Sequence, residues 1–230
     1  KGQVARARQA TFFGVRNPGD RATDLSLNQL ILPLLDRLEK GKTSKVAREK
    51  KLLSQWQVAS VLEQEATHAR LARLMGGDET PALLFTASHG VGFGRSDPEQ
   101  LPFQGALVCQ DWEGPLGGGI QREHYFTGED VVDAANPFGM MAFHFACYGG
   151  GTPYHDEFYE RYNKTRMPIA PYSFLAGLPK RLLAHPRGGA LAVVGHVERA
   201  WTHSFKWKTN DGQPADFYDV LTRLMEGYPI

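Results

Sequence analysis

Two short blocks of this sequence each end an apolar run in a chemically reactive side chain. Residues 83–90 have the sequence LLFTASHG, which ends in His89-Gly90. Residues 141–150 have the sequence MAFHFACYGG, which places Cys147 just before a run of glycines. If both runs are buried strands of one parallel sheet, their carboxyl ends bring an imidazole and a thiol to the same edge. A cysteine nucleophile with a histidine base requires this pair of side chains.

The chemistry expected of this pair is acyl transfer. The imidazole takes the thiol proton, the thiolate attacks an amide carbonyl to form a thioester, and the imidazolium then protonates the departing amine. The charge that develops on the carbonyl oxygen needs hydrogen-bond donors. We expect the backbone N–H groups of Gly90 and Cys147 to form this oxyanion hole, because glycine permits the close approach of a substrate.

The elements that must position these residues can be predicted from the pattern of apolar residues. Continuous apolar runs predict strands at residues 11–15, 57–62, 82–87, 140–146 and 190–195, and a hairpin strand at 105–109. Helical spacing predicts helices at residues 27–38, 65–75, 179–185 and 217–225, and a short one at 127–134. Apolar strands separated by helices predict an α/β fold with a mostly parallel sheet covered on both faces.

Local signals mark the start of the first helix. Residues 17–20 (NPGD) form a turn signal after the first strand. Ser26 and Gln29 have the spacing of a capping box, which predicts that the helix begins there. Pro33 predicts a kink or a delayed start of this helix.

Composition limits the class of protein. The 230 residues suffice for one domain with a full core, so we expect a single domain over residues 1–230. The formal net charge of +1 gives no indication that nucleic acid or an acidic membrane is a partner, and no apolar run reaches the about 20 residues of a membrane span. Two cysteines indicate free thiols in a reducing compartment. With a polar, basic start at Lys1, these features predict a cytoplasmic domain, a fragment of a longer chain.

Each reactive residue also has a structural interpretation. Cys147 alone could be a buried structural cysteine, and His89 a strand-end histidine bonded to backbone, but their matching contexts favour the pair. Cys109 lacks such a context and is expected to be structural. We expect His144, which lies on the cysteine strand, to be packed and hydrogen-bonded. The histidines here lack the spacing of a known zinc site, so no metal or other cofactor is expected.

The glycine-rich loops admit weaker interpretations. Residues 89–95 lack the third glycine and the lysine-serine pair of phosphate-binding loops, so we expect a loop beside the dyad. The three glycines at residues 117–119 predict the tip of a hairpin, and the alternative is that they shape part of a substrate cleft. The basic run at residues 41–51 is typical of a solvated surface.

The chain resembles a CHAT domain, a branch of the caspase-like clan CD cysteine peptidases that also includes separase and gingipain. The His-Gly and Ala-Cys blocks carry most of the resemblance. Residues 13–25, 63–67 and 188–201 are similar to the family's first strand with its turn, the helix start before the histidine strand, and the strand-plus-tryptophan segment. The resemblance implies a caspase-like three-layer α/β/α sandwich and a His89/Cys147 dyad with no obligatory third member.

The same resemblance implies a cysteine endopeptidase, a thiol protease that hydrolyses a protein substrate. It also implies a bacterial intracellular setting, sometimes in defence, with activity switched by a sensor domain or an activating protein. Relatives that cleave after Lys or Arg use an acidic side chain in the first substrate pocket. Asp156 and Glu198 are candidates for it, a solvated surface role being the alternative for each. Trp201 either walls the cleft or packs in the core.

Two other functions stay open on the sequence. A catalytically silent scaffold would keep the fold and bind a partner protein. An acyl- or thiol-transfer enzyme would use the same thioester but pass the acyl group to an acceptor other than water.

Overall fold

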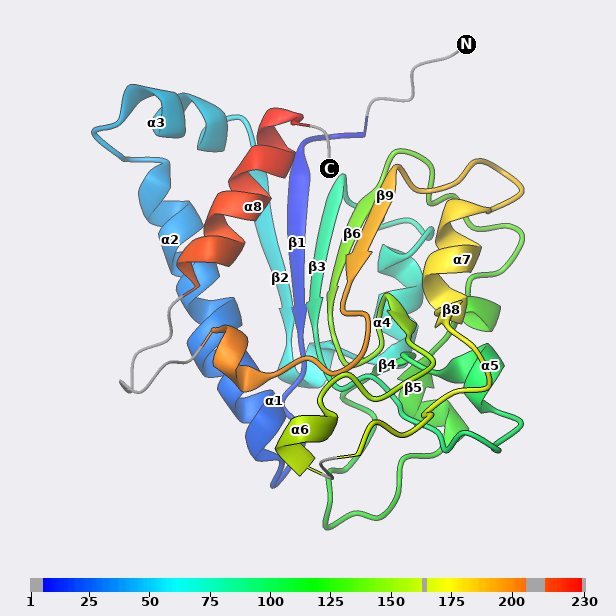
Figure 1. The fold of residues 1–230 in the computed structure, drawn as a ribbon. Coiled ribbons are helices and arrows are strands. Elements are labelled where there is room, and N and C mark those ends of the chain that lie inside the picture. Colours follow the sequence, from blue (N-terminus) through cyan, green and yellow to red (C-terminus); the bar gives the residue numbers. More distant parts are fainter. Residues whose placement is uncertain (1–5, 163–164, 206–213, 229–230) are drawn as a thin grey trace.

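The protein is built on a five-stranded, all-parallel sheet. The computed structural model describes residues 6–162, 165–205 and 214–228. The strand order is β2 (Gln57–Leu62), β1 (Gln9–Gly14), β3 (Leu83–Ala87), β6 (Met141–Phe145) and β9 (Ala192–Gly195) (Figure 1). All four strand pairs are parallel. The predicted α/β class, the parallel sheet and the five strand positions are therefore confirmed.

Helices pack against both faces of this sheet, and two buried clusters fill the spaces between. One face is covered by α1 (Arg21–Ser26), α2 (Leu32–Gly41) and α8 (Ala215–Glu226), and α3 (Ala47–Leu53) adds Leu53 to that cluster. The other face is covered by α4 (His68–Leu74), α7 (Gly177–Leu183) and the hairpin of β4 (Leu107–Val108) and β5 (Tyr125–Phe126). The sheet is thus buried on both sides, which is why its strands are continuously apolar.

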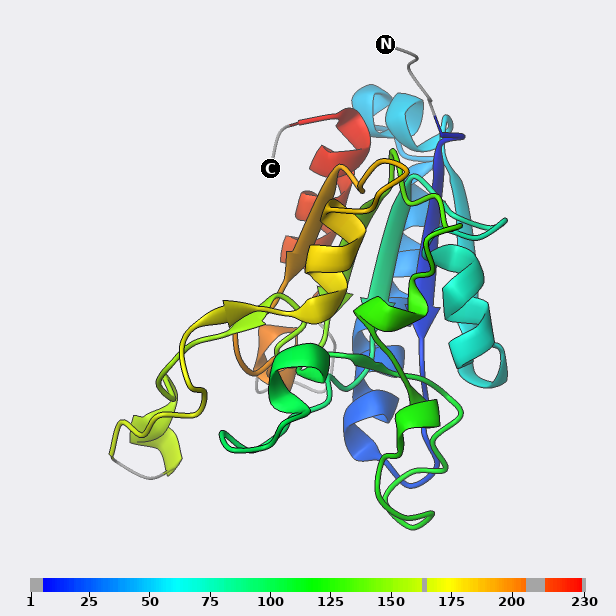
Figure 2. The same cartoon turned by 90° about the vertical axis from the view of Figure 1, so that its right-hand side faces the viewer.

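Smaller elements lie at the carboxyl end of the sheet. They are α5 (Gln100–Phe103), β7 (Gly151–Thr152), α6 (Tyr159–Tyr162) and β8 (Phe174–Leu175). β7 pairs antiparallel with β8, and the segment between them, which carries α6, extends away from the sheet (Figure 2). None of the helices in the described ranges has the length and hydropathy needed to cross a lipid bilayer.

The predicted start of the first helix was wrong. The helix begins at Arg21, and Asp20 caps it by accepting hydrogen bonds from the N–H groups of Ala22 and Thr23. The capping carboxylate of Asp20, six residues before Ser26, satisfies the free N–H groups, so Ser26 is already helical. The predicted disturbance at Pro33 takes the form of a π-helical turn over residues 27–31 (Leu27–Ile31), directly before the proline. Proline clashes with the carbonyl four residues back, and a wider turn relieves this.

The helix predicted at residues 127–134 is also shorter than expected. A single 3-10 turn, Gly128–Asp130, closes between the side chains of Thr127 and Asp130, which cap it reciprocally. Val131 ends this turn in a bend, and a second turn follows, closed by the Ala135 N–H donating to the Val132 carbonyl at 2.9 Å. β-branched Val131 and Val132 disfavour a continued helix. The hairpin strand is confirmed, but only Leu107–Val108 of residues 105–109 pair.

A row of aromatic side chains fixes the register of the central strands. Phe12, Phe85 and Phe143 are paired across β1, β3 and β6. Their ring centroids are 5.5 Å apart between Phe12 and Phe85, and 5.0 Å apart between Phe85 and Phe143. A slip of one residue would turn this row to the opposite face of the sheet, so the register is strongly determined.

Candidate active site

The register of β3 and β6 brings His89 and Cys147 to adjacent positions. Ala87 pairs with Phe145 at the ends of the two strands. The pairing continues one step further, because the N–H of Ser88 donates to the Phe145 carbonyl at 3.2 Å. His89 and Cys147 each lie two residues beyond that last pair. The two strands therefore deliver the imidazole and the thiol to the same edge of the sheet, as the sequence predicted.

A small cavity of about 120 Å³ contains both residues in its wall. Four segments contribute: α1, the chain at the end of β3, the chain at the end of β6, and the chain after β9. The lining residues are Ala22, Thr23, Ser26, Ser88, His89, Phe145, Cys147, Ala200, Thr202 and Phe205. Residues far apart in the sequence thus enclose one hollow at the carboxyl edge, where α/β sheets usually bind ligands.

Burial favours the protonated form of the Cys147 thiol. Burial raises its pKa, and this outweighs the opposing effects of Ala200, the positive charge of Arg199 and the nearby backbone N–H groups. The sulfur lies 3.8 Å from the Ala200 carbonyl oxygen, to which the S–H donates. Among the described contacts of these two residues, no hydrogen bond joins Cys147 to His89.

Gly90 packs directly on the backbone of Cys147. A β-carbon at position 90 would lie 1.8 Å from the Cys147 carbonyl oxygen, so only glycine fits here. The backbone N–H groups of Cys147 and Gly90 are near enough to the sulfur to oppose the rise of its pKa, although burial dominates. The two amides named as candidate oxyanion donors therefore both lie beside the thiol.

Sequence reasoning missed one residue that contacts this pair. Asp20 Oδ2 lies 2.6 Å from His89 Nε2. Burial opposes the ionisation of Asp20, but the hydrogen bonds from His89, Thr23 and Ala22 outweigh it and lower the pKa of Asp20 to about 2. Trp112 packs edge-on against the His89 ring with 6.0 Å between centroids. The turn after the first strand was visible in the sequence, but a helix cap accounts for an aspartate there without reference to His89.

The two acidic candidates for the substrate pocket lie together but are already paired. Arg199 donates to Asp156 Oδ1 at 2.9 Å, to Asp156 Oδ2 at 3.2 Å and to Glu198 Oε1 at 2.5 Å. The side chains of Asp156 and Glu198 are 5% and 1% exposed. Arg199 lowers the pKa of Asp156, whereas burial raises the pKa of Glu198. Neither carboxylate is open to a substrate in this conformation.

This cluster is connected to the cysteine loop through the backbone. Tyr148, the residue after Cys147, donates its N–H to the Glu198 carbonyl at 2.6 Å. Both residues have positive φ, 58° for Tyr148 and 96° for Glu198, a conformation that costs free energy for residues other than glycine. The loops after β6 and β9 therefore hold each other in a strained arrangement around the thiol.

The remaining candidates lie away from the cavity wall. Trp201 packs edge-on against Phe158, with 5.4 Å between ring centroids, and is not part of the lining. Cys109 is fully buried, and burial raises the pKa of its thiol well above the ordinary value. His144 is also fully buried, and desolvation lowers its pKa to about 4, so the ring is neutral at pH 7. Within the described residues no group of three or more His, Cys, Asp or Glu side chains is arranged to hold a metal ion.

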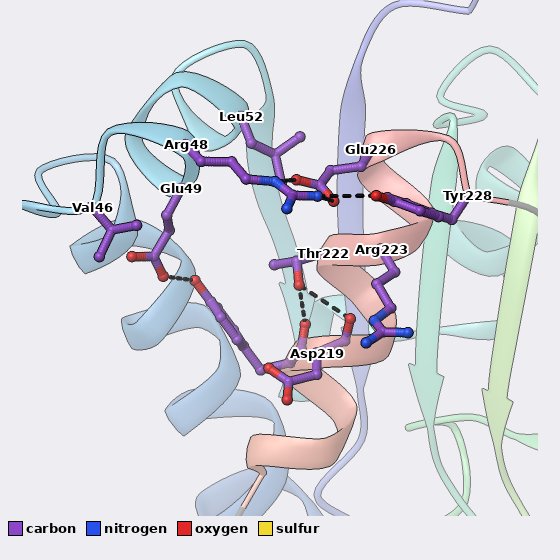
Figure 3. Close-up of a pocket in the computed structure, with 10 residues that line it drawn as sticks. Val46, Arg48, Glu49, Leu52, Asp219, Thr222, Arg223, Glu226 and Tyr228 are labelled. Atoms are coloured by element: carbon purple, nitrogen blue, oxygen red, sulfur yellow. Dashed lines mark hydrogen bonds and ion pairs between the residues drawn. The ribbon is translucent and has the colours of Figure 1, made fainter.

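A second hollow, of about 490 Å³, lies between α3 and α8 (Figure 3). Its polar side chains bond to one another: Arg48 donates twice to Glu226 at 2.8 Å, and the Tyr218 hydroxyl donates to Glu49. It lies at the end of the sheet where the strands begin, opposite the carboxyl edge (Figure 1). Neither a cysteine nor a histidine lines it, so the thiol chemistry is expected at the carboxyl edge.

Comparison with known proteins adds no family. No protein-family model matches this chain, and a search of curated proteins finds no match. The argument for function therefore depends on the geometry of the site.

Proposed function

We propose that this chain is a cysteine endopeptidase with a caspase-like three-layer α/β/α sandwich, as the resemblance to CHAT domains implies. The observation that carries the proposal is the shared position of His89 and Cys147, two residues beyond the last pair of adjacent parallel strands. Helices on both faces of the sheet and a cavity bordered by both side chains support it.

In the proposed reaction, His89 takes the proton from Cys147 and the thiolate attacks the carbonyl carbon of a peptide bond. The N–H groups of Gly90 and Cys147 stabilise the oxyanion of the tetrahedral intermediate. Protonated His89 then gives its proton to the departing amine, which leaves a thioester on Cys147. A water molecule, deprotonated by His89, hydrolyses the thioester and restores the free thiol.

The site supports a protein with basal activity that a partner raises. Burial raises the pKa of Cys147, and its S–H is directed to the Ala200 carbonyl. Attack on a substrate requires the sulfur to leave that carbonyl and to meet His89. The strained pair of loops around Tyr148 and Glu198 is the element that a sensor domain or an activating protein would shift. We also propose a cytoplasmic location and a role in bacterial defence, and only the resemblance to CHAT domains supports these two points.

A test at the thiol itself separates an enzyme from a silent scaffold. Iodoacetamide reacts with thiolate, so an assembled His89–Cys147 pair predicts rapid alkylation of Cys147. The rate is measured by mass spectrometry of the labelled peptides. His89→Gln should slow that rate about 100-fold, since a general base contributes about 10²–10⁴-fold. Buried Cys109 in the same molecule is the internal reference for an inert thiol.

Equal alkylation of Cys147 in the parent and in His89→Gln, at the rate of Cys109, would favour the scaffold that binds a partner protein. A peptide library, digested by the parent and by Cys147→Ala, then gives cleavage and its sequence preference. Adding an amine acceptor to the same digest distinguishes hydrolysis from acyl transfer, because a transferase would form the amide in preference to the acid.

A further inference from the structure

Asp20 lies between β1 and α1, at the carboxyl edge of the sheet where His89 also lies. The chain leaves β1 toward β2 on one side and later places β3 on the other side of β1. The chain therefore leaves β1 and β3 toward opposite sides at the carboxyl edge, which is the usual ligand site in such sheets. Asp20 follows β1 and His89 follows β3, so this strand order brings the two residues to the same edge.

The turn that carries Asp20 is firmly held. The amide of buried Asn17 donates to the carbonyls of Cys109 and Trp112, at 3.0 and 2.8 Å. The Asp20 N–H donates to the Asn17 carbonyl at 3.1 Å, and Gly19 between them has a φ of 69°. Trp112, whose carbonyl binds this turn, also packs against the His89 ring. One network thus fixes both partners of the Asp20–His89 contact.

Capping a helix does not account for this contact. Oδ1 of Asp20 accepts from the Ala22 N–H at 3.2 Å, and Oδ2 accepts from the Thr23 N–H at 3.3 Å. Serine or asparagine would cap α1 equally well. Unlike serine or asparagine, an ionised carboxylate has two negatively charged oxygens that accept hydrogen bonds. One of them, Oδ2, lies 2.6 Å from His89 Nε2.

We propose that Asp20 is a positioning residue for His89, a third member of the site that the family resemblance does not require. The inference deepens the proposed endopeptidase function and rests on it. The carboxylate accepts the Nε2–H of the neutral ring, which leaves Nδ1 without a proton and able to take one from Cys147. When His89 becomes an imidazolium, the same carboxylate stabilises its positive charge.

The decisive variant is Asp20→Asn. Its side chain has one oxygen and one NH₂ group in place of two oxygens. With the oxygen capping α1, the NH₂ group faces His89 and favours the ring tautomer protonated at Nδ1. The kcat should fall about 100-fold or more with little change in KM, because loss of such a carboxylate costs up to about 10⁴-fold in kcat. Alkylation of Cys147 should slow in parallel. Asp24→Asn, one turn along α1 and paired with Arg16 rather than His89, is the matched control.

Nitrogen-15 NMR of the histidine rings gives a measurement that does not depend on activity, with His89→Gln used for assignment. We expect Nε2–H in the parent and Nδ1–H in Asp20→Asn, and circular dichroism verifies the fold. An unchanged tautomer, or alkylation equal to that of Asp24→Asn, overturns the proposal. Should Asp20→Asn not fold, Asp20→Ser, which keeps a cap without a carboxylate, is expected to slow alkylation to the same degree and to lose the fixed Nε2–H.

The two proposals fail in different ways. If the parent cleaves no peptide and alkylates Cys147 no faster than Cys109, yet the tautomer still depends on Asp20, then the endopeptidase is excluded and the positioning contact stands. If the parent is active and Asp20→Asn equals it in kcat and tautomer, then the endopeptidase stands and the role of Asp20 is excluded.

Discussion

Gly90→Ala is the most direct perturbation of the geometry on which the proposed function depends. A methyl group at position 90 would lie 1.8 Å from the Cys147 carbonyl oxygen, 2.8 Å from its carbonyl carbon and 3.0 Å from its nitrogen. All three atoms are backbone, so no side chain can rotate away to make room. The loop after β3 must therefore move away from the loop after β6.

The size of that movement follows from the same distances. Ordinary contact for a β-carbon begins at 3.4 Å, so the backbones must separate by about 1.6 Å. A misplacement of about 1 Å can cost about 100-fold in rate, so kcat/KM should fall at least about 100-fold. Overpacking of this kind costs about 1–3 kcal/mol of unfolding free energy. At about 2–4 °C per kcal/mol for a domain of this length, Tm should fall by about 2–12 °C.

Nearby glycines provide controls in the same loop. A β-carbon at Gly94 meets nothing within 4 Å, and one at Gly92 meets only the Tyr148 ring at 3.6 Å. Gly94→Ala and Gly92→Ala should therefore keep near-parent rates of Cys147 alkylation and peptide cleavage. If Gly90→Ala behaves as these two do in both assays, then His89 and Cys147 do not depend on the contact between their loops, and the reasoning is refuted.

Two further predictions concern charge. The pKa of Asp20 is lowered from 3.8 to about 2, so its ionised form stabilises the fold by about 2 kcal/mol above pH 4. This stabilisation is lost as the pH falls toward 2. Acid unfolding followed by circular dichroism should therefore show a smaller loss of stability for Asp20→Asn than for the parent. Arg199→Ala leaves two buried carboxylates without their cation and should cost about 3 kcal/mol at pH 8. The cost should be smaller at pH 5, because burial raises the pKa of Glu198 and so favours its neutral form as the pH falls. Thermal melts at both pH values test this, and Arg73→Ala, which breaks a similar pair of contacts on the surface, should show no such pH dependence.

The part of the site that could be predicted from sequence is the part that strand register determines. Continuous apolar runs identify β3 and β6, and Phe85 and Phe143 lie at matching positions within them. Once those rings are paired, the positions of His89 and Cys147 follow by counting along two strands. The same local signals located α4, α7 and α8 to within a few residues, since each depends on apolar spacing and on glycine or proline at its ends.

Pairings between loops could not be predicted in this way. The sequence predicts Asp156 and Glu198 near the site, but nothing in their spacing indicates that Arg199 would bind both. Whether an acidic side chain faces a substrate or an internal guanidinium depends on how the loops after β7 and β9 fold over each other. Long-range side-chain geometry of this kind is set by tertiary packing and has no periodicity to detect.

Asp20 illustrates why a residue with two roles is hard to find. Its position after a turn and before a helix already accounts for an aspartate, because the Ala22 and Thr23 N–H groups need an acceptor. That local explanation is correct and complete by the usual rules of helix capping, so it leaves nothing that would prompt a search for a second partner. Only the strand order, with β3 next to β1, brings Asp20 and His89 to within 2.6 Å of each other. A capping carboxylate at the diverging ends of two parallel strands therefore has to be examined for a second, distant partner whenever the neighbouring strand ends in a histidine.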